Sequence, residues 1–547
     1  MSAPIMEERM TNDIRVLIVN NIKLSVNASY KEAFSLAKKK IASVSVYPKD
    51  AEYSIYRRSV DARRKSDIKF IYSVAVRGIF PKGCEQRLLS VGASFDKSEY
   101  PSAECGSELM SDRPVVVGSG PCGLFCALML AERGYAPILL ERGSGVSERK
   151  AAVERFRKFG VLDPNTNIQF GAGGAGTFSD GKLVTRVNDG MGNYVLSRFV
   201  EFGAPTDITY VAKPHIGTDV LLSVVDNIVD RIRELGGEVR FKTRFTGYEA
   251  RNGRVVSVST DGGDIPAGAL VLAIGHSSRD TYEYLLSRDV MIEAKNFSVG
   301  MRIEHLADDI DEALYGSFAG HPNLGRAEYA LSHNTKERGV YTFCMCPGGE
   351  VVAAASEEGG VVVNGMSERN RDGRNSNSAV VCSIFKEDYG ASAKEAISFC
   401  RKIERAAYRA GGSDYYAPMI TVGDFLSDKA SSEPGRVIPT YMDGKVRIAR
   451  PEKYLPEFVC ASIKNALLDF DRKIKGFANS EAVLTGAETR TSAPVRILRD
   501  SENRRAPGYD NLYPAGEGAG YAGGITSAAI DGIRTALAII GRYKPLS

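Results

Sequence analysis

The spacing of apolar positions divides the chain into segments of different texture. Strand-like runs occur at RVLIVNNIKLSV, ASVSVYP and IKFIYSVAV, and the helix-like YKEAFSLAKKKIA lies between the first two. This pattern predicts a small α+β domain over residues 1–110. The polar segment SELMSDRP (107–114) ends in proline, which is typical of a linker before a new domain.

From residue 115 the pattern changes to strand, glycine turn, helix and strand, and strand-like runs return at EVRFKTRF, VVSVST and ALVLAIG. Mixed strands, polar loops and a helix-like piece near 394–410 follow, and a strand with a glycine-opened helix returns after Leu512. We expect residues 112–290 and 485–547 to form one α/β nucleotide-binding domain. A mixed α+β domain at 291–484 would interrupt it.

The stretch VVVGSGPCGLFCALMLAERGYAPILLE meets the contextual requirements of a Rossmann dinucleotide fingerprint. Gly118 allows a tight turn, Gly120 lets the backbone approach a pyrophosphate, and Gly123 lets the helix pack on the strand. Pro121 suits the first helical turn, where its missing N–H costs nothing. Glu141 closes the next strand, where a carboxylate can bind the adenosine ribose and would repel a 2′-phosphate. FAD or NAD is therefore favoured over NADP.

The C-terminal stretch NLYPAGEGAGYAGGITSAAIDG favours FAD over NAD, because only the longer cofactor needs a second strand-end site. Gly516 and Glu517 end a strand, and Glu517 can hold ribityl or phosphate oxygens. Gly523, Gly524 and Ile525 open a helix whose N–H groups can face the flavin O2. Four further cofactor contacts are expected along the chain, at Arg142, Glu238, Val239 and Gly275.

A second glycine-rich motif, FGAGGAGTFSDGKL (170–183), also matches G-x-G-x-x-G, but no apolar strand precedes it and no helix pattern follows. We interpret it as a loop laid along the same FAD, with bare backbone passing close to the flavin. The cofactor-binding residues expected there are Gly173, Gly174, Gly176, Thr177 and Ser179. Lys182 is a candidate catalytic residue near the flavin, although a solvated surface lysine has the same sequence signature.

Several long motifs together resemble a known family. They are FGAGGAGTFSDGKL, HIGTD, LAIGHSSRD, VGMRIEH, YTFCMCPGG, VVNGMS, ETRTSAPVRI and GEGAGYAGGITSAAIDG, and SVDARRKSDIKFIYSV matches near the N-terminus. The chain resembles bacterial FAD-dependent proteins described as NAD/FAD-utilising dehydrogenases, which are two-dinucleotide-binding-domain flavoproteins. The resemblance implies bound FAD and a glutathione-reductase-like FAD-binding domain with an inserted second domain. It does not specify a reaction.

Candidate chemistry outside the FAD motifs rests on arginines and cysteines. Arg302 and Arg490 could each clamp a carboxylate or phosphate, or each could form a structural ion pair, for instance Arg490 with Glu488. Cys344 and Cys346 could be redox-active. On a strand their Cα atoms would lie about 6.5 Å apart, near the limit for a disulfide, so two buried small side chains are the favoured alternative.

Composition adds few constraints. The net charge of +4 does not require a nucleic-acid partner, and the basic run RRSVDARRKSDIK (57–69) has no interleaved aromatic residues, which favours a solvated face. Nine cysteines without C-x-x-C spacing fit a reducing cytoplasm and suggest no metal site. Gly118 to Pro121 break the apolar run at 115–131, so no membrane span is expected.

The sequence thus predicts a cytoplasmic FAD-dependent oxidoreductase. It would transfer a hydride between an unidentified small molecule and flavin N5, with an unknown electron donor or acceptor such as NAD(P)H. The alternative is a flavoprotein that acts as a binding or RNA-associated module through its N-terminal domain.

Overall fold

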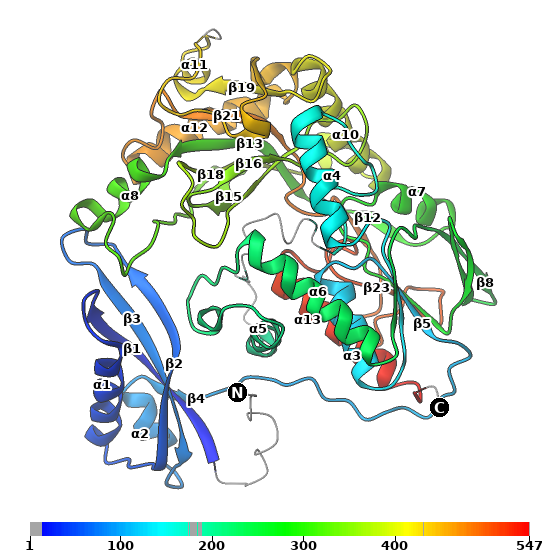
Figure 1. The fold of residues 1–547 in the computed structure, drawn as a ribbon. Helices are drawn as coiled ribbons and strands as arrows, with labels where there is room; N and C mark the ends of the chain where they lie inside the picture. Colours follow the sequence, from blue (N-terminus) through cyan, green and yellow to red (C-terminus); the bar gives the residue numbers. More distant parts are fainter. Residues whose placement is uncertain (1–13, 173, 175–182, 184–188, 430–431, 546–547) are drawn as a thin grey trace.

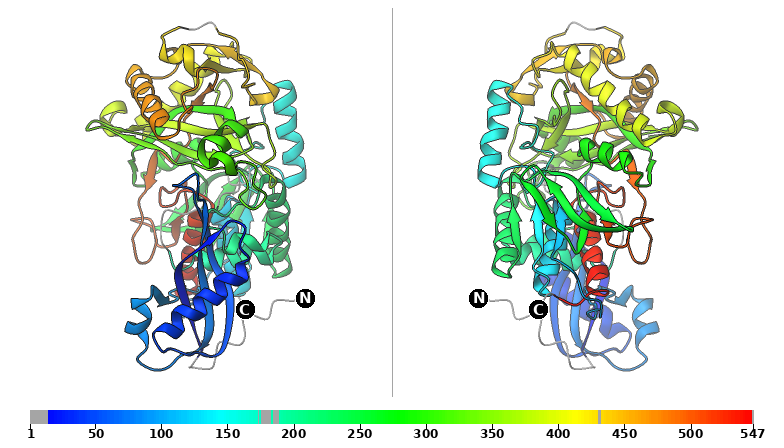
Figure 2. Two further views of the ribbon diagram at one scale, coloured as in Figure 1. Left: turned by 90° about the vertical axis from the view of Figure 1, so that its left-hand side faces the viewer. Right: turned by 90° about the vertical axis from the view of Figure 1, so that its right-hand side faces the viewer.

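The computed structural model describes residues 14–172, 174, 183, 189–429 and 432–545. Three bodies are visible in Figure 1: an N-terminal domain in blue, a parallel sheet covered by helices, and a larger mixed domain in green, yellow and orange. Figure 2 shows from two sides that the larger domain lies above the other two. No helix in the described ranges is long and apolar enough to cross a membrane.

The N-terminal domain is a four-stranded antiparallel sheet in the order β2-β3-β1-β4. Its elements are β1 (Ile14–Ser25), α1 (Tyr30–Ser43), β2 (Lys49–Asp61), β3 (Lys69–Ile79), α2 (Glu85–Ser90) and β4 (Ala93–Phe95). The strand predicted at ASVSVYP is wrong. Ser29 and Glu32 form a capping box that starts α1, and its buried face continues to Ile41, so the helix runs into this segment and the strand begins at Lys49.

The basic run is not wholly a solvated face. The backbone of Arg58 in β2 pairs with a distant segment, through Arg58 N to Tyr210 O at 2.6 Å and Ala212 N to Arg58 O at 2.8 Å. Its guanidinium lies over the rings of Phe70 and Tyr210. This cation therefore helps to join the N-terminal domain to the segment that leads into α6.

The parallel sheet has the order β23-β11-β5-β6-β7, and all four pairings are parallel. Its strands are β5 (Pro114–Val117), β6 (Ile138–Leu140), β7 (Glu238–Arg240), β11 (Ala269–Leu272) and β23 (Leu512–Pro514). One face packs on α3 (Pro121–Glu132), α5 (Gly192–Glu201), α6 (Thr218–Glu234) and α13 (Ile525–Ile540). The other face packs on β8 (Phe245–Arg251), β9 (Arg254–Thr260) and β10 (Gly263–Pro266). Burial on both faces explains the continuous apolar run of β5.

The larger domain contains a seven-stranded sheet in the order β14-β15-β18-β13-β21-β19-β20, antiparallel except for β19 with β20. Its strands are β13 (Phe297–Leu306), β14 (Ser332–Asn334), β15 (Gly339–Cys346), β18 (Asn375–Ile384), β19 (Ala417–Thr421), β20 (Val446–Ile448) and β21 (Val483–Glu488). Its helices are α8 (Ala307–Tyr315), α9 (Lys386–Tyr389), α10 (Ala393–Ala410), α11 (Val422–Leu426) and α12 (Glu457–Lys473). Strand β21 crosses the domain boundary expected at 484/485.

Short elements join the two larger bodies. These are α4 (Val146–Phe159), α7 (Arg279–Ser287), the paired strands β12 (Ile292–Ala294) and β22 (Val495–Ile497), and the paired strands β16 (Glu350–Ala353) and β17 (Val363–Met366). Arg157 of α4 forms ion pairs with Glu350 of β16 and with Asp443, which precedes β20. These ion pairs join α4 to the larger domain.

Candidate functional site

A cavity of ≈ 710 Å³ lies between the carboxyl ends of β5, β6, β11 and β23 and the seven-stranded sheet. Its wall includes many residues that the sequence predicts to bind the cofactor: Gly118, Gly120, Pro121, Glu141, Arg142, Gly275, Glu517, Gly523, Gly524 and Ile525. Arg490 lines the same cavity from the other side. These segments lie far apart along the chain, and the structure brings them to one place.

The turn between β5 and α3 needs its glycines. Gly118 has φ +98°, and a Cβ there would lie 2.4 Å from the carbonyl oxygen of Ala273. A Cβ on Gly123 would lie 1.8 Å from the carbonyl oxygen of Gly118. Pro121 is the first residue of α3, as predicted. The turn therefore has the shape that brings a helix N-terminus to the cavity.

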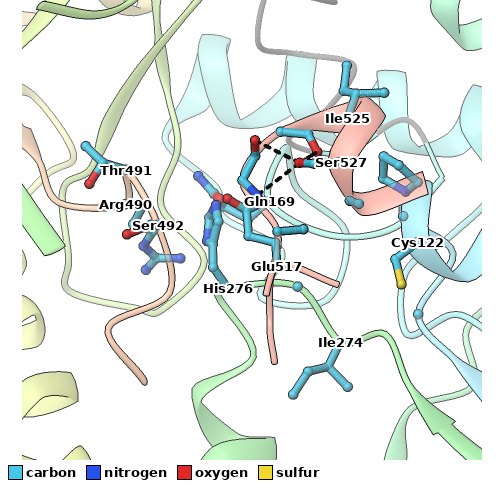
Figure 3. A pocket seen from close by; sticks show the side chains of 18 of the residues that line it. Cys122, Gln169, Ile274, His276, Arg490, Thr491, Ser492, Glu517, Ile525 and Ser527 are labelled. Atoms are coloured by element: carbon cyan, nitrogen blue, oxygen red, sulfur yellow. Dashed lines mark hydrogen bonds between the residues drawn. The ribbon is translucent and has the colours of Figure 1, made fainter. Parts of the chain in front are cut away.

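Two helices point uncapped N-termini into the cavity. Neither α3 nor α13 has a side chain that caps its first turn. Gly120 at the start of the first helix and Gly524 at the start of the second line the cavity. So do Cys122 and Ile525 beside them, which Figure 3 labels. Unpaired N–H groups and the positive ends of two helix dipoles favour an anionic ligand such as a diphosphate.

Glu141 is almost fully enclosed by protein partners. Its Oε2 accepts hydrogen bonds from the Ser119 amide at 3.2 Å and hydroxyl at 2.6 Å, and its Oε1 accepts one from Gly143 N at 2.8 Å. The guanidinium of Arg149, which is fully buried, lies 3.4 Å from Oε1. The carboxylate predicted for a ribose is thus already held in place.

Glu517 stands in the opposite situation. The described part of the chain gives its carboxylate no hydrogen-bond partner, and burial raises its pKa to about 7, while Lys295 on the cavity wall partly offsets the shift. Burial and the nearby Arg496 guanidinium lower the pKa of Lys295. A ligand that donates hydrogen bonds to Glu517 and accepts them from Lys295 would stabilise the charged form of each group.

The start of the glycine-rich segment packs against the turn between β5 and α3 and against Glu141. The Ala172 amide donates to the Ser119 hydroxyl at 2.7 Å, and a Cβ on Gly171 would collide with Glu141 at 1.9 Å. Gly174 N donates to Gly171 O at 2.8 Å, and Gly174 does not line the cavity. Five predicted site residues lie outside the described residues: Gly173, Gly176, Thr177, Ser179 and Lys182.

Arg490 does not pair with Glu488, so the suggested ion pair is wrong. Its guanidinium donates instead to Glu404 of α10 at 3.2 and 3.3 Å and to the Ser356 hydroxyl. Strand β21 ends at Glu488, so Arg490 lies beyond the strand and does not follow its alternation. Glu488 pairs instead with Arg302 at 3.0 Å.

Five other predicted residues do not line the cavity. Arg302 is fully buried under the sheet, where it also donates to Asn377 at 2.6 Å. Glu238 and Val239 form β7, and Glu238 is paired with Arg113 and Arg240. Gly123 lies in the first turn of α3, packed on Gly118, and Gly516 follows β23, packed on Cys122.

Cys344 and Cys346 do not form a disulfide. A register shift lies between Phe343 and Cys346, and Cys344 has φ +45°, so the two residues do not follow a regular strand. Cys344 lines the cavity and is half-buried, whereas Cys346 is buried. The prediction of two buried side chains thus holds for Cys346 and not for Cys344.

Sequence reasoning missed His276, Lys295 and Glu488 as parts of the cavity wall. His276 belongs to the quoted motif LAIGHSSRD, directly after the glycine at the end of β11, and this position is the signal that could have identified it. Burial, together with the Arg490 and Arg279 guanidiniums, lowers the pKa of His276 to about 3. Its imidazole is therefore neutral at physiological pH.

The residues present fit FAD. Two uncapped helix N-termini, a turn at Gly118 without room for a Cβ, and acids that follow two strands face one cavity. A diphosphate would be held by the helix N-termini, and the two acids lie at separate ends of the sheet, as a long dinucleotide requires.

A family model agrees with this fit. A family model described as FAD-dependent protein, C-terminal domain-like, matches residues 296–491, and a domain of unknown function (DUF8436) matches residues 17–77. Among solved structures, CtdE in complex with FAD is 12% identical with a TM-score of 0.31 and covers 79% of this chain and 84% of its own. L-amino acid deaminase from Proteus vulgaris is 13% identical with a TM-score of 0.32 and covers 82% and 98%.

Those two structures are too distant to bear on substrate or reaction. A curated protein of Clostridium beijerinckii, named only as an uncharacterised protein, is much closer in sequence: it is 45% identical over 531 residues, which is 96% of this chain and 98% of the relative. This chain is a member of the same family, a family of FAD-dependent proteins, and its cofactor is FAD.

Proposed function

We propose that the protein is an FAD-dependent oxidoreductase that transfers a hydride between a small-molecule substrate and flavin N5. The observation that carries this proposal is the cavity, which is continuous from two helix N-termini to the polar wall of the seven-stranded sheet. A purely structural cofactor would not need a second, polar half of the cavity. The polar groups there include Glu488 and Arg490, and His276, which follows β11 of the parallel sheet, adds a further polar group to the cavity wall.

In this proposal the parallel sheet is a Rossmann-type, glutathione-reductase-like FAD-binding domain, and the seven-stranded sheet covers the flavin. Gly118, Gly120 and the start of α3 would hold the diphosphate, Glu141 the ribose, and Glu517 the ribityl chain. The start of α13 would face the flavin, where its N–H groups favour negative charge. FAD supplies two-electron chemistry when bound. The chain's own residues position the substrate and exclude water.

The test is the visible spectrum of the purified protein, recorded anaerobically and again after NADH or NADPH is added. A flavin spectrum that bleaches with either nucleotide supports an oxidoreductase whose electron partner is NAD(P)H. A flavin that stays oxidised with both nucleotides, and also with candidate substrates, would support the alternative of a binding module. A protein that takes up no FAD would contradict the proposal.

A further inference from the structure

The cavity wall carries an incompletely balanced positive charge at Arg490. Glu404, which is almost fully buried, accepts two hydrogen bonds from Arg279 at 2.7 and 2.8 Å and one from the Thr489 hydroxyl at 2.6 Å. Its contacts with Arg490 are longer, at 3.2 and 3.3 Å. Arg279 has a second carboxylate partner in Glu357 at 2.6 Å, whereas Glu404 is the one carboxylate bonded to Arg490 among the described residues, so the cation nearer the cavity is the less well compensated.

Arg490 also has donors to spare. A guanidinium has five N–H groups, and Glu404 and Ser356 use three of them. Burial and the neighbouring Arg279 lower the pKa of Arg490, the direction expected where a buried cation lacks a full counter-charge. A carboxylate in the cavity would supply this counter-charge in a bidentate geometry.

A hydrogen-bond relay fixes the tautomer of His276. The Gln169 amide donates to Ala354 O at 3.0 Å, so its oxygen accepts from the Ser277 hydroxyl at 3.1 Å. The Ser277 oxygen must then accept from His276 Nδ1 at 2.8 Å. The proton is therefore on Nδ1, and Nε2 carries a lone pair. The described residues give Nε2 no partner, and His276 lines the cavity near Arg490 in Figure 3.

We propose that Arg490 and His276 form a subsite for a 2-hydroxy carboxylate, with Arg490 binding the carboxylate and His276 Nε2 accepting a hydrogen bond from the hydroxyl group. The proposal rests on the proposed function and names its substrate class. An ammonium group in place of the hydroxyl would lie beside two guanidiniums and be repelled. The rest of the substrate would contact the apolar side chains Tyr329, Phe343 and Met345, which also line the cavity.

Four matched probes test the subsite by isothermal titration calorimetry on the FAD-loaded protein. They are mandelate, phenylacetate without the hydroxyl, mandelamide without the charge, and phenylglycine with an amine; lactate and propionate form a smaller pair. We expect mandelate to bind about 5–10-fold more tightly than phenylacetate and at least about 30-fold more tightly than mandelamide. Phenylglycine should bind more weakly than phenylacetate.

Variants assign the two contacts. Arg490→Met should remove the preference for mandelate over mandelamide, and His276→Phe should reduce mandelate to the affinity of phenylacetate without changing phenylacetate itself. Ser277→Ala keeps the imidazole but frees its tautomer, so it should lower the hydroxyl preference by about threefold. Arg436→Gln is the matched control: it removes an exposed ion pair with Asp309 away from the cavity wall and should change no affinity by more than about twofold.

The outcomes separate this inference from the proposed function. Retention of FAD, seen in the visible spectrum of each variant, tests the cofactor site independently of the probes. Equal affinities for mandelate and mandelamide, tighter binding of phenylglycine, or no binding of either hydroxy acid by the FAD-loaded protein would each overturn the subsite. None of these results would by itself contradict an FAD-dependent oxidoreductase.

Discussion

Two strand ends of the same parallel sheet carry acids predicted to bind the cofactor, and the structure treats them differently. At the end of β6, Glu141 is almost fully buried and bonded to Ser119, Gly143 and Arg149. Beyond the end of β23, Glu517 has no hydrogen-bond partner in the described part of the chain, and burial raises its pKa to about 7. The protein itself supplies hydrogen-bond donors to Glu141, whereas its described part supplies none to Glu517.

The difference has a physical basis. A carboxylate whose lone pairs are filled by protein donors loses little when the ligand leaves, because its partners stay in place. A buried carboxyl without donors holds its proton more tightly, and gains most when a ligand supplies hydrogen bonds. We infer that the adenosine end of the site is preorganised and that the flavin end depends on FAD.

Glycine substitutions should give the largest contrast between the two ends. Gly123→Ala places a Cβ 1.8 Å from backbone, so we expect it to abolish FAD retention and to lower the free energy of unfolding by about 4 kcal/mol or more. A Cβ on Gly523 meets nothing within 4 Å, so Gly523→Ala should change the free energy of unfolding by less than about 0.5 kcal/mol. Urea unfolding and flavin absorbance measure both effects. Equal losses for the two variants would contradict the comparison.

The two acids themselves give the next contrast. In FAD-free protein, Glu141→Gln leaves the fully buried Arg149 without its carboxylate and should cost about 3–4 kcal/mol of unfolding free energy. Glu517→Gln removes no hydrogen bond found in the described part of the chain and no ionisation penalty applies to it, so it should not lower the unfolding free energy at pH 7, although it should weaken FAD binding. Urea unfolding with and without FAD measures both. A greater cost for Glu517→Gln would reverse the assignment of the preorganised end.

Local sequence patterns were sufficient to predict one half of the site. The turn at Gly118–Gly123, the start of α3 at Pro121 and the helix after Gly524 are set by neighbours in the chain, and all three occur as predicted. The apolar strand β5 is likewise recognisable because it is buried on both faces. A motif identifies such features because the residues that cause them are adjacent in sequence.

The other half depends on contacts that no local pattern encodes. Glu404, Arg279 and Arg490 come from three separate segments of the chain, and Glu404 accepts hydrogen bonds from both arginines. The tautomer of His276 depends on the hydrogen bond from Ser277 to Gln169, which lies 108 residues earlier than Ser277. The suggested pair of Arg490 with Glu488 was wrong for this reason. Opposite charges two residues apart suggested that pair, but Arg490 pairs with Glu404 and Glu488 pairs with Arg302, and only the fold brings these partners together.

The pH dependence of stability should differ between the ends. The raised pKa of Glu517 means that the folded protein keeps a proton that the unfolded chain releases, so its contribution to stability is lost as pH rises from about 4.5 to about 7. Between pH 5 and 8, wild-type FAD-free protein should therefore lose about 1–2 kcal/mol more unfolding free energy than Glu517→Gln. Unfolding curves at both pH values measure this. Parallel behaviour of the two proteins would show that Glu517 is not buried as a neutral acid.

Two serines provide the smallest and most direct comparison. Ser119 donates to Glu141 at 2.6 Å and accepts from Ala172 at 2.7 Å inside the preorganised end, so Ser119→Ala should cost about 1 kcal/mol even without FAD. Within the described residues, Ser527 makes local hydrogen bonds with Gly523 and Gly524 at the start of α13, so Ser527→Ala should cost less than about 0.5 kcal/mol. Adding FAD should leave the cost of Ser119→Ala in unfolding free energy unchanged, because Ser119 already has its hydrogen-bond partners. If FAD instead enlarges the cost of Ser119→Ala, then the adenosine end is also completed by the cofactor, and preorganisation is confined to the turn itself.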